Sequence, residues 1–229
     1  MPGPAPPKKP VDTLGMTTKH HKLAWTEQHG PETFKCSLDV AMHPAKSSII
    51  LLTMSGVEGS ADGYQGKYVT IAQNAQREHG VAAVRIGNPF ISSLSWESNL
   101  RHTLDYVIAR SAEIAGPEFK EIRIMAHSAG GTVAGLMAWE YPEVSRLLLV
   151  NPALKHGYQQ VEDGLRKFRG STTVLFGEHD SSIFLGQELG KLPRVQVLNI
   201  KDADHHFLGD AIHAFINASS QYLFDSKEQ

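Results

Sequence analysis

The sequence predicts an α/β protein with a mostly parallel β-sheet and helices on both faces. Two observations lead to this prediction. Short runs of consecutive apolar residues, which are typical of strands buried on both sides, alternate with longer segments of helical periodicity. The alternation continues from residue 48 to residue 224, and repeated strand–helix–strand units favour parallel pairing.

The chain has 229 residues, of which 41% are hydrophobic, and this suits one well-buried domain. Residues 1–17 are rich in proline and poor in large apolar side chains, so we expect a flexible tail before a single domain over 18–229. The formal net charge of -2 offers no excess of positive charge to a phosphate backbone, so nucleic acid is not an expected partner. We expect a cytoplasmic protein without a membrane span, because the sequence shows neither a long apolar run nor a signal pattern.

Two strands with a turn at Gly30-Pro31 are expected to open the domain, at His20–Gly30 and Thr33–Met42. The second contains Cys36, the single cysteine, at an alternating position that predicts burial. One cysteine excludes an internal disulfide and leaves no thiolate metal cluster of the usual kind.

The rest of the chain alternates between the two patterns. Buried strands are expected at 48–54, 81–86, 121–125, 144–150, 172–176 and 195–200. Helical segments are expected at 64–79, 100–112, 132–139, 159–169, 183–189 and 210–224.

The stretch Ile122–Gly131, IRIMAHSAGG, carries the clearest chemical signal. A strand that becomes a helix within two residues forces the turning residue into a strained backbone, so its neighbours must be small, as Ala126 and Gly130 are. Such a turn lifts the hydroxyl of Ser128 clear of the chain, while the new helix directs its free N–H groups to the same place. The pattern therefore predicts a nucleophile.

The segment Ala126-His127-Ser128-Ala129-Gly130 resembles the G-x-S-x-G elbow of the α/β-hydrolase family. Alanine replaces the first glycine, as in small lidless lipase-like members. The chain order is also similar over nearly all of residues 18–225, with two edge strands and then the serine after the third parallel strand. The resemblance implies an α/β-hydrolase fold. No large lid domain is expected, because only about twenty residues separate Asn151 from Thr172, where many members insert one.

A serine hydroxyl needs a base, and the base needs an orienting carboxylate. In this family the acid and then the histidine follow the serine along the chain. The loop Gly177-Glu178-His179-Asp180 follows one expected strand, and its similarity to the G-x-x-D loop of family members implies Asp180 as the acid. Glu178 and Asp204 are the competing carboxylates, and a solvated turn is the alternative without chemistry.

The loop after the last expected strand, Asp202–Phe207, contains two adjacent histidines, of which only one can face the serine. Similarity to the A-D-H-aromatic loop of the family implies His205 as the base and leaves His206 in an aromatic position. A histidine pair also suggests a metal site, but the other ten histidines show no ligand spacing and no cysteine assists. We therefore expect neither metal nor cofactor.

An oxyanion hole would complete the site. One donor would be the backbone N–H of Ala129, directly after the serine. The resemblance assigns the second donor to the loop Ser55–Ser60, where Ser55-Gly56 stands in place of the family's His-Gly and makes Val57 the candidate. Gly56 and Gly59 are alternatively simple turn residues.

The expected mouth of the site is mostly apolar, which suits an acyl chain or an aromatic ring. The residues expected there are Val57, Phe90, Ile91, Leu94, Trp96, Phe184, Leu185 and Phe207. Leu94 and Trp96 are alternatively filling residues beneath a loop. His127 is expected to pack or hydrogen-bond beneath the elbow, and Arg85 to form a structural ion pair rather than to meet an anionic substrate.

The sequence thus predicts a serine hydrolase that cleaves a carboxylic ester or thioester through an acyl-enzyme, with Ser128, His205 and Asp180 as its triad. Its partner would be a small-molecule acyl substrate, and the residues carry no signal for an oligomeric state. The alternatives are an acyltransferase or a peptidase with the same triad, or a non-catalytic binding protein on the same fold.

Overall fold

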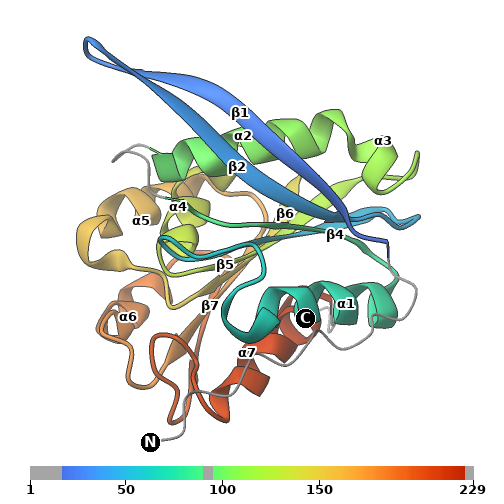
Figure 1. Ribbon diagram of the computed structural model, residues 1–229. Helices are drawn as coiled ribbons and strands as arrows, with labels where there is room; N and C mark the ends of the chain where they lie inside the picture. The colour runs from blue at the N-terminus through green and yellow to red at the C-terminus, as the bar shows by residue number, and fades with distance from the viewer. Residues whose placement is uncertain (1–16, 90–94, 225–229) are drawn as a thin grey trace, which may run out of the picture.

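The computed structural model describes residues 17–89 and 95–224 (Figure 1). The expected tail lies outside these residues apart from residue 17. The described chain contains one eight-stranded sheet with the order β1-β2-β4-β3-β5-β6-β7-β8. Strand β2 is antiparallel to both β1 and β4, and the other pairs are parallel. The prediction of a mostly parallel sheet is confirmed.

The strands lie close to their predicted positions. They are β1 (Lys19–His29), β2 (Glu32–His43), β3 (Ile49–Met54), β4 (Ala82–Ile86), β5 (Glu121–His127), β6 (Val144–Val150), β7 (Ser171–Gly177) and β8 (Val195–Ile200). Strand β5 continues two residues beyond the predicted end, because His127 still pairs with Val150 of β6. Cys36 is buried in β2, as expected.

The helices differ more from prediction. They are α1 (Lys67–His79), α2 (Ser95–Ala109), α3 (Ser111–Ile114), α4 (Ala129–Met137), α5 (Tyr158–Lys167), α6 (Gly186–Leu189) and α7 (Ala211–Ser219). The first begins three residues late because Gln65 and Gly66 have positive φ angles, of 53° and 70°, which break the helix. The last, expected to reach Phe224, changes to a π-helical turn over Ser220–Phe224.

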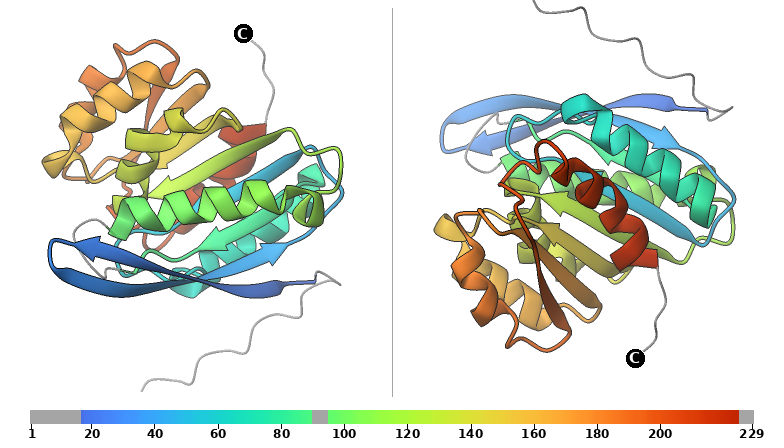
Figure 2. Two further views of the ribbon diagram at one scale, coloured as in Figure 1. Left: turned by 90° about the horizontal axis from the view of Figure 1, so that it is seen from above. Right: turned by 90° about the horizontal axis from the view of Figure 1, so that it is seen from below.

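The sheet lies between two helical layers, and each layer encloses its own apolar core (Figures 1 and 2). Helices α2 to α6 contribute to one core and α1 and α7 to the other. Strand β3 shows why both layers are needed, since Ile50 and Leu52 enter the first core and Leu51 enters the second. None of the helices in the described ranges combines the length and apolar character that crossing a bilayer requires.

The carboxyl ends of β5, β6, β7 and β8 lie side by side at one edge of the sheet. In open parallel sheets this edge is where loops gather to form sites. The connection from β6 to β7 contains only a short 3-10 turn, Leu154–His156, and helix α5. No large lid domain is inserted there, in agreement with the prediction.

Candidate active site

Ser128 stands at the turn between β5 and α4 with φ 55° and ψ -122°, a conformation that costs a non-glycine residue free energy. Its N–H still donates to the carbonyl oxygen of Val150 at 3.0 Å, which anchors the turn to the sheet. The residue at position 130 must also be small, because a Cβ on Gly130 would lie 2.5 Å from the carbonyl oxygen of Ser55. The local sequence thus folds into the strained strand-to-helix turn that was predicted.

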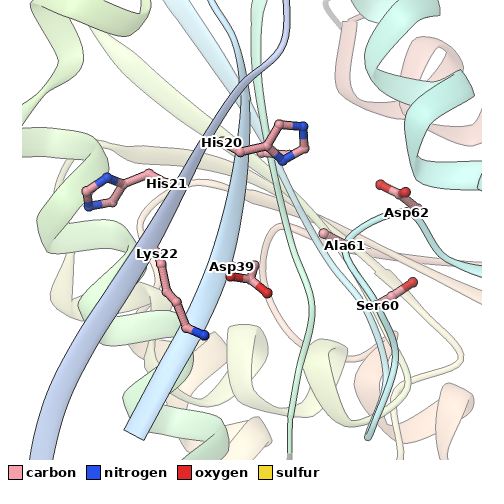
Figure 3. Close-up of a pocket in the computed structure, with 8 residues that line it drawn as sticks. His20, His21, Lys22, Asp39, Ser60, Ala61 and Asp62 are labelled. Carbon is pink, nitrogen blue, oxygen red and sulfur yellow. The ribbon is translucent and has the colours of Figure 1, made fainter.

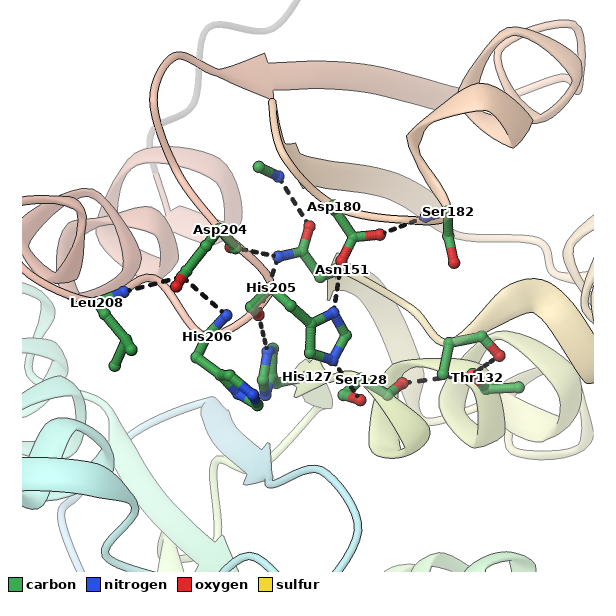
Figure 4. A network of polar contacts seen from close by, with 12 residues as sticks. His127, Ser128, Thr132, Asn151, Asp180, Ser182, Asp204, His205, His206 and Leu208 are labelled. Carbon is green, nitrogen blue, oxygen red and sulfur yellow. Dashed lines mark hydrogen bonds and ion pairs between the residues drawn. The ribbon is translucent and has the colours of Figure 1, made fainter.

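The structure brings Ser128, His205 and Asp180 together (Figure 4). His205 Nε2 lies 2.9 Å from Ser128 Oγ, and His205 Nδ1 hydrogen-bonds Asp180 Oδ2. We call these three residues the serine cluster. A carboxylate on Nδ1 places the proton there and leaves the lone pair of Nε2 directed at the hydroxyl. The arrangement can therefore accept the hydroxyl proton, and the catalytic roles of the three residues remain predictions.

Asp180 is buried within a tight turn after β7. Its Oδ1 accepts the N–H of Ser182 at 2.7 Å, while Oδ2 is taken by His205. Burial by itself would raise the pKa of Asp180, but these hydrogen bonds outweigh it and hold the pKa below the usual value. The carboxyl group is thus kept ionised next to the imidazole.

The competing residues have other contacts. Glu178 is exposed and accepts the N–H of Asp202 at 2.9 Å. Asp204 accepts hydrogen bonds from the N–H groups of His206 and Leu208, both at 3.0 Å. These bonds stabilise the turn of the loop Asp202–Phe207, which we call the histidine loop. The His206 side chain is exposed at the surface of this loop. None of these three groups contacts Ser128 through a hydrogen bond among the described residues.

His127 was expected to pack or hydrogen-bond beneath the elbow, and it hydrogen-bonds the backbone of the histidine loop instead. Its Nε2 is 2.8 Å from the carbonyl oxygen of His205, so Nε2 carries the proton and donates it. Burial, together with the nearby charge of Lys67, lowers the pKa of His127 to about 3. A neutral imidazole therefore supports the backbone of the loop from below.

Asn151, directly after β6, is a residue that the sequence analysis missed. It is fully buried with φ 42°, and its Nδ2 donates to the carbonyl oxygens of Asp204 and His205, each at 3.0 Å. Its Oδ1 accepts the N–H of Gly177 at 2.7 Å. The Asn151 side chain thus connects the loop Gly177–Asp180, which contains Asp180, to the histidine loop, which contains His205. Its position directly after a buried strand is the one signal that was available.

The residues predicted to supply the two oxyanion donors, Val57 and Ala129, lie close to Ser128 in the structure. Ala129 is the first residue of α4, where backbone N–H groups have no partner within the helix. Gly56 approaches Ser128 so closely that a Cβ would lie 3.0 Å from Ser128 Cβ, and Val57 follows it. Within the described ranges neither the N–H of Val57 nor that of Ala129 donates to a backbone carbonyl. Both therefore remain candidates.

The predicted mouth is only partly reproduced. Val57 and Phe184 are exposed, at 49% and 66% of their surface, on loops that lead from β3 and from Asp180. Phe207 was expected there but is buried, because its positive φ of 55° turns it into the core against Phe215. Trp96 and Leu185 are partly buried against the other core. Phe90, Ile91 and Leu94 lie outside the described residues.

A second polar group lies near the antiparallel end of the sheet, and we call it the arginine cluster. The buried guanidinium of Arg85 donates from Nε to His43 Nε2 at 2.9 Å, and from one terminal nitrogen to Asp62 and to the carbonyl oxygen of Ala61 at 2.9 Å. The expected structural ion pair is therefore present. Burial, and then the adjacent guanidinium, lowers the pKa of His43 to about 4.

A polar groove adjoins the arginine cluster (Figure 3). It lies between the β1–β2 hairpin and the loop that contains Asp62. It is lined by His20, His21, Lys22, Asp39, Ala41, Ser60, Ala61 and Asp62. The groove mixes both charge signs without a nucleophile and base in contact, so the serine cluster is the stronger candidate site.

Two groups of side chains could hold a metal ion among the described residues. One combines His127 with His205 and His206, and the other combines Glu178, His179 and Asp202 at the surface. In the sequence only the adjacent pair His205-His206 indicated a metal site. The fold adds His127, which is 78 residues away from His205 in the chain.

No protein-family model matches the sequence, and no curated protein matches it. The structure, however, is similar to solved structures. Est1E from Butyrivibrio proteoclasticus superimposes with a TM-score of 0.64 at 15% identity, covering 87% of this chain and 97% of that chain. Dienelactone hydrolase from Anabaena variabilis gives a TM-score of 0.57 at 18% identity, covering 89% and 97%.

Peroxisomal alpha-beta-hydrolase Lpx1 from Saccharomyces cerevisiae gives a TM-score of 0.68 at 12% identity, covering 91% of this chain and 88% of that chain. These identities are low, and the likeness extends over almost the whole of each chain. The likeness is therefore one of the arrangement of sheet and helices rather than of sequence. The chain has the α/β-hydrolase fold.

Proposed function

We propose that this protein is a serine hydrolase that cleaves a carboxylic ester or thioester, with Ser128 as nucleophile, His205 as general base and acid, and Asp180 as the orienting carboxylate. The observation that carries the proposal is the hydrogen-bonded series from Asp180 through His205 to Ser128 Oγ. Proteins of similar structure include an esterase domain from Rhodothermus marinus and the dienelactone hydrolase, and they support the same reaction class.

In the proposed reaction, Ser128 Oγ attacks the carbonyl carbon of the substrate while His205 Nε2 takes the hydroxyl proton. The tetrahedral intermediate collapses, the bond to the leaving alcohol or thiol breaks, and His205 returns the proton to that group. Water then enters, loses a proton to His205 and attacks the carbonyl carbon of the acyl-enzyme. The bond to Ser128 Oγ breaks, His205 returns the proton to Oγ, and the acid is released. Asp180 keeps the imidazole in one tautomer and stabilises the imidazolium in both halves.

The negative oxygen of each intermediate would be bound by the backbone N–H groups of Val57 and Ala129. The close approach of Gly56 to Ser128 supports this assignment, because it brings the next peptide group to the side of the nucleophile. A well-placed donor of this kind contributes about 3 to 4 kcal/mol of transition-state stabilisation.

An apolar acyl or aromatic group is the substrate class that the surroundings favour. Val57 and Phe184 leave large apolar areas exposed on the loops nearest the nucleophile and the acid. A structure of Est1E holds ferulic acid, an aromatic acid, at a TM-score of 0.64 and 14% identity to this chain. We extend the preference for an aromatic or acyl group to this protein as part of the proposal.

The decisive experiment is intact mass after incubation with a fluorophosphonate, on the natural chain and on Ser128→Ala. We expect one adduct on the natural chain and none on the variant, because only an activated serine reacts with this probe. A panel of esters, thioesters and amides with the same acyl group then shows which type of bond is cleaved. Added alcohol acceptors reveal acyl transfer. A folded natural chain without any adduct would contradict the proposal and favour a binding protein.

A further inference from the structure

Three imidazoles, one from the end of β5 and two from the loop after β8, meet beside Ser128. The ring centroids of His205 and His206 are 5.0 Å apart, those of His127 and His205 are 5.3 Å apart, and those of His127 and His206 are 6.2 Å apart. Each ring offers one nitrogen within 4.8 Å of those of the other two. Figure 4 shows the three side chains gathered on one side of Ser128.

The hydrogen bonds determine which nitrogens are available. His127 donates from Nε2 to the carbonyl oxygen of His205, so its Nδ1 holds a lone pair. That Nδ1 faces the loop after β3, since it lies 3.6 Å from the position of a Cβ on Gly56. His206 is exposed, which gives an ion a path from solvent and lets the ring rotate.

We propose that Zn²⁺ binds to His127, His205 and His206 and reversibly inhibits the serine chemistry. Three imidazoles with a water molecule in the fourth position are a known zinc coordination set. With zinc–nitrogen bonds of about 2.0 to 2.1 Å, neighbouring tetrahedral ligands stand roughly 3.4 Å apart. The three nitrogens now lie within 4.8 Å of one another and must approach when zinc binds, which requires the exposed His206 ring to turn and the His205 ring to move.

Inhibition follows from the contacts of His205. Its Nδ1 is bonded to Asp180 and its Nε2 to Ser128 Oγ, so both ring nitrogens are already in use. An ion that binds either nitrogen must break one of these hydrogen bonds. Metal binding and activation of the serine therefore exclude one another, a conclusion that rests on the proposed function.

The surface group of Glu178, His179 and Asp202 supplies an internal control. It contains one imidazole and two carboxylates, a set that suits hard ions better than zinc. Its Glu178 carboxylate is also engaged by the N–H of Asp202. If zinc bound there instead, His179 and not His206 would determine the affinity.

Zinc binding is measured first, by isothermal titration calorimetry with ZnCl₂ on the full chain, on His206→Ala and on His179→Ala. We expect one zinc ion per chain, an affinity at least about tenfold weaker in His206→Ala, and no change in His179→Ala. Circular dichroism and thermal melting establish that both variants fold. Loss of binding in His179→Ala with full retention in His206→Ala would overturn the proposal.

Inhibition is measured next, by the rate of fluorophosphonate labelling with and without zinc. Zinc should slow labelling of the natural chain and of His179→Ala, and EDTA should restore the rate. His206→Ala should need at least about ten times more zinc for the same slowing, each variant being compared with its own metal-free rate. Equal zinc sensitivity in all three proteins would contradict the assigned site.

The two proposals fail in different ways. Zinc binding that depends on His206 in a protein that forms no adduct would support the metal site and contradict the hydrolase. An adduct that forms at the same rate with saturating zinc would support the hydrolase and overturn the inhibitory site.

Discussion

The serine cluster and the arginine cluster contain similar groups in different arrangements. Each joins a histidine and an aspartate to a third polar side chain. In the serine cluster the histidine is central and links the carboxylate to a hydroxyl, whereas in the arginine cluster the guanidinium is central and takes the lone pair of His43. A histidine near a carboxylate therefore becomes a candidate base only when its second nitrogen faces a reactive group.

The largest effect should separate the two aspartates. Asp180→Asn is expected to lower kcat by about 10⁴, because the amide favours the wrong imidazole tautomer. Asp62→Asn should leave kcat within about twofold, since the Asp62 side chain is 63% exposed and bonds only Arg85 among the charged groups described. Ester hydrolysis with folding verified by circular dichroism tests both. Similar losses in the two variants would remove the distinction between the clusters.

At the arginine cluster, low pH should reduce the free energy of unfolding rather than change the rate of hydrolysis. His43 has a pKa of about 4 when folded and about 6.5 when unfolded, so the unfolded chain binds the proton more readily between these values. The contribution of neutral His43 is complete above pH 6.5 and is lost as pH falls toward 4, by about 3 kcal/mol.

This prediction is tested with His43→Gln, which keeps an acceptor for Arg85. The free energy of unfolding from urea titrations at pH 7 and pH 4 should differ less in His43→Gln than in the natural chain. The exposed His213→Gln serves as the control and should retain the full difference. An unchanged pH dependence in His43→Gln would show that His43 does not carry this acid sensitivity.

A smaller effect tests the close approach at the nucleophile. A Cβ on Gly56 would lie 3.0 Å from Ser128 Cβ and 3.5 Å from Oγ, so Gly56→Ala should displace the hydroxyl and lower kcat by roughly 10². Gly190→Ala is the matched control, because its Cβ meets nothing closer than 3.4 Å and its φ is helical at -65°. Full activity of Gly56→Ala would argue against a tightly fixed nucleophile.

Contact with substrate should give the smallest change. Phe184→Ser removes an exposed apolar side chain without disturbing the core, so KM for a long acyl or aromatic ester should rise a few-fold while kcat stays constant. A short acetyl ester is the control and should respond less. A fall in kcat with unchanged KM would place Phe184 outside the substrate-binding surface.

Periodicity in the sequence predicted the sheet well because central parallel strands are buried on both faces and read as apolar runs, as Ile49–Met54 does. Helix limits were harder, since the break at Gln65 and the π-helical turn at Ser220 depend on backbone angles that side-chain patterns do not report. Phe207 shows the same limit, because a single positive φ sent an expected surface residue into the core.

The candidate site was predictable where family-like loops follow strands in order, as at Ser128, Asp180 and His205. Asn151 was not predictable, because its partners at Gly177 and His205 are 26 and 54 residues away and no spacing rule connects them. The contact of His127 with the histidine loop is equally long-range, at 78 residues. Such contacts depend on which strands become neighbours, and this is known only once the sheet is assembled.

The positive φ of Ser128 also affects the stability of the protein. Residues held at such angles are destabilised by about 1 to 3 kcal/mol, and glycine relieves most of that cost. Selection for thermal resistance alone would therefore favour Ser128→Gly, a chain that melts higher and lacks the proposed nucleophile. A library screened only for heat tolerance would therefore enrich Ser128→Gly. Stabilised variants of this protein have to be selected for ester hydrolysis at the same time.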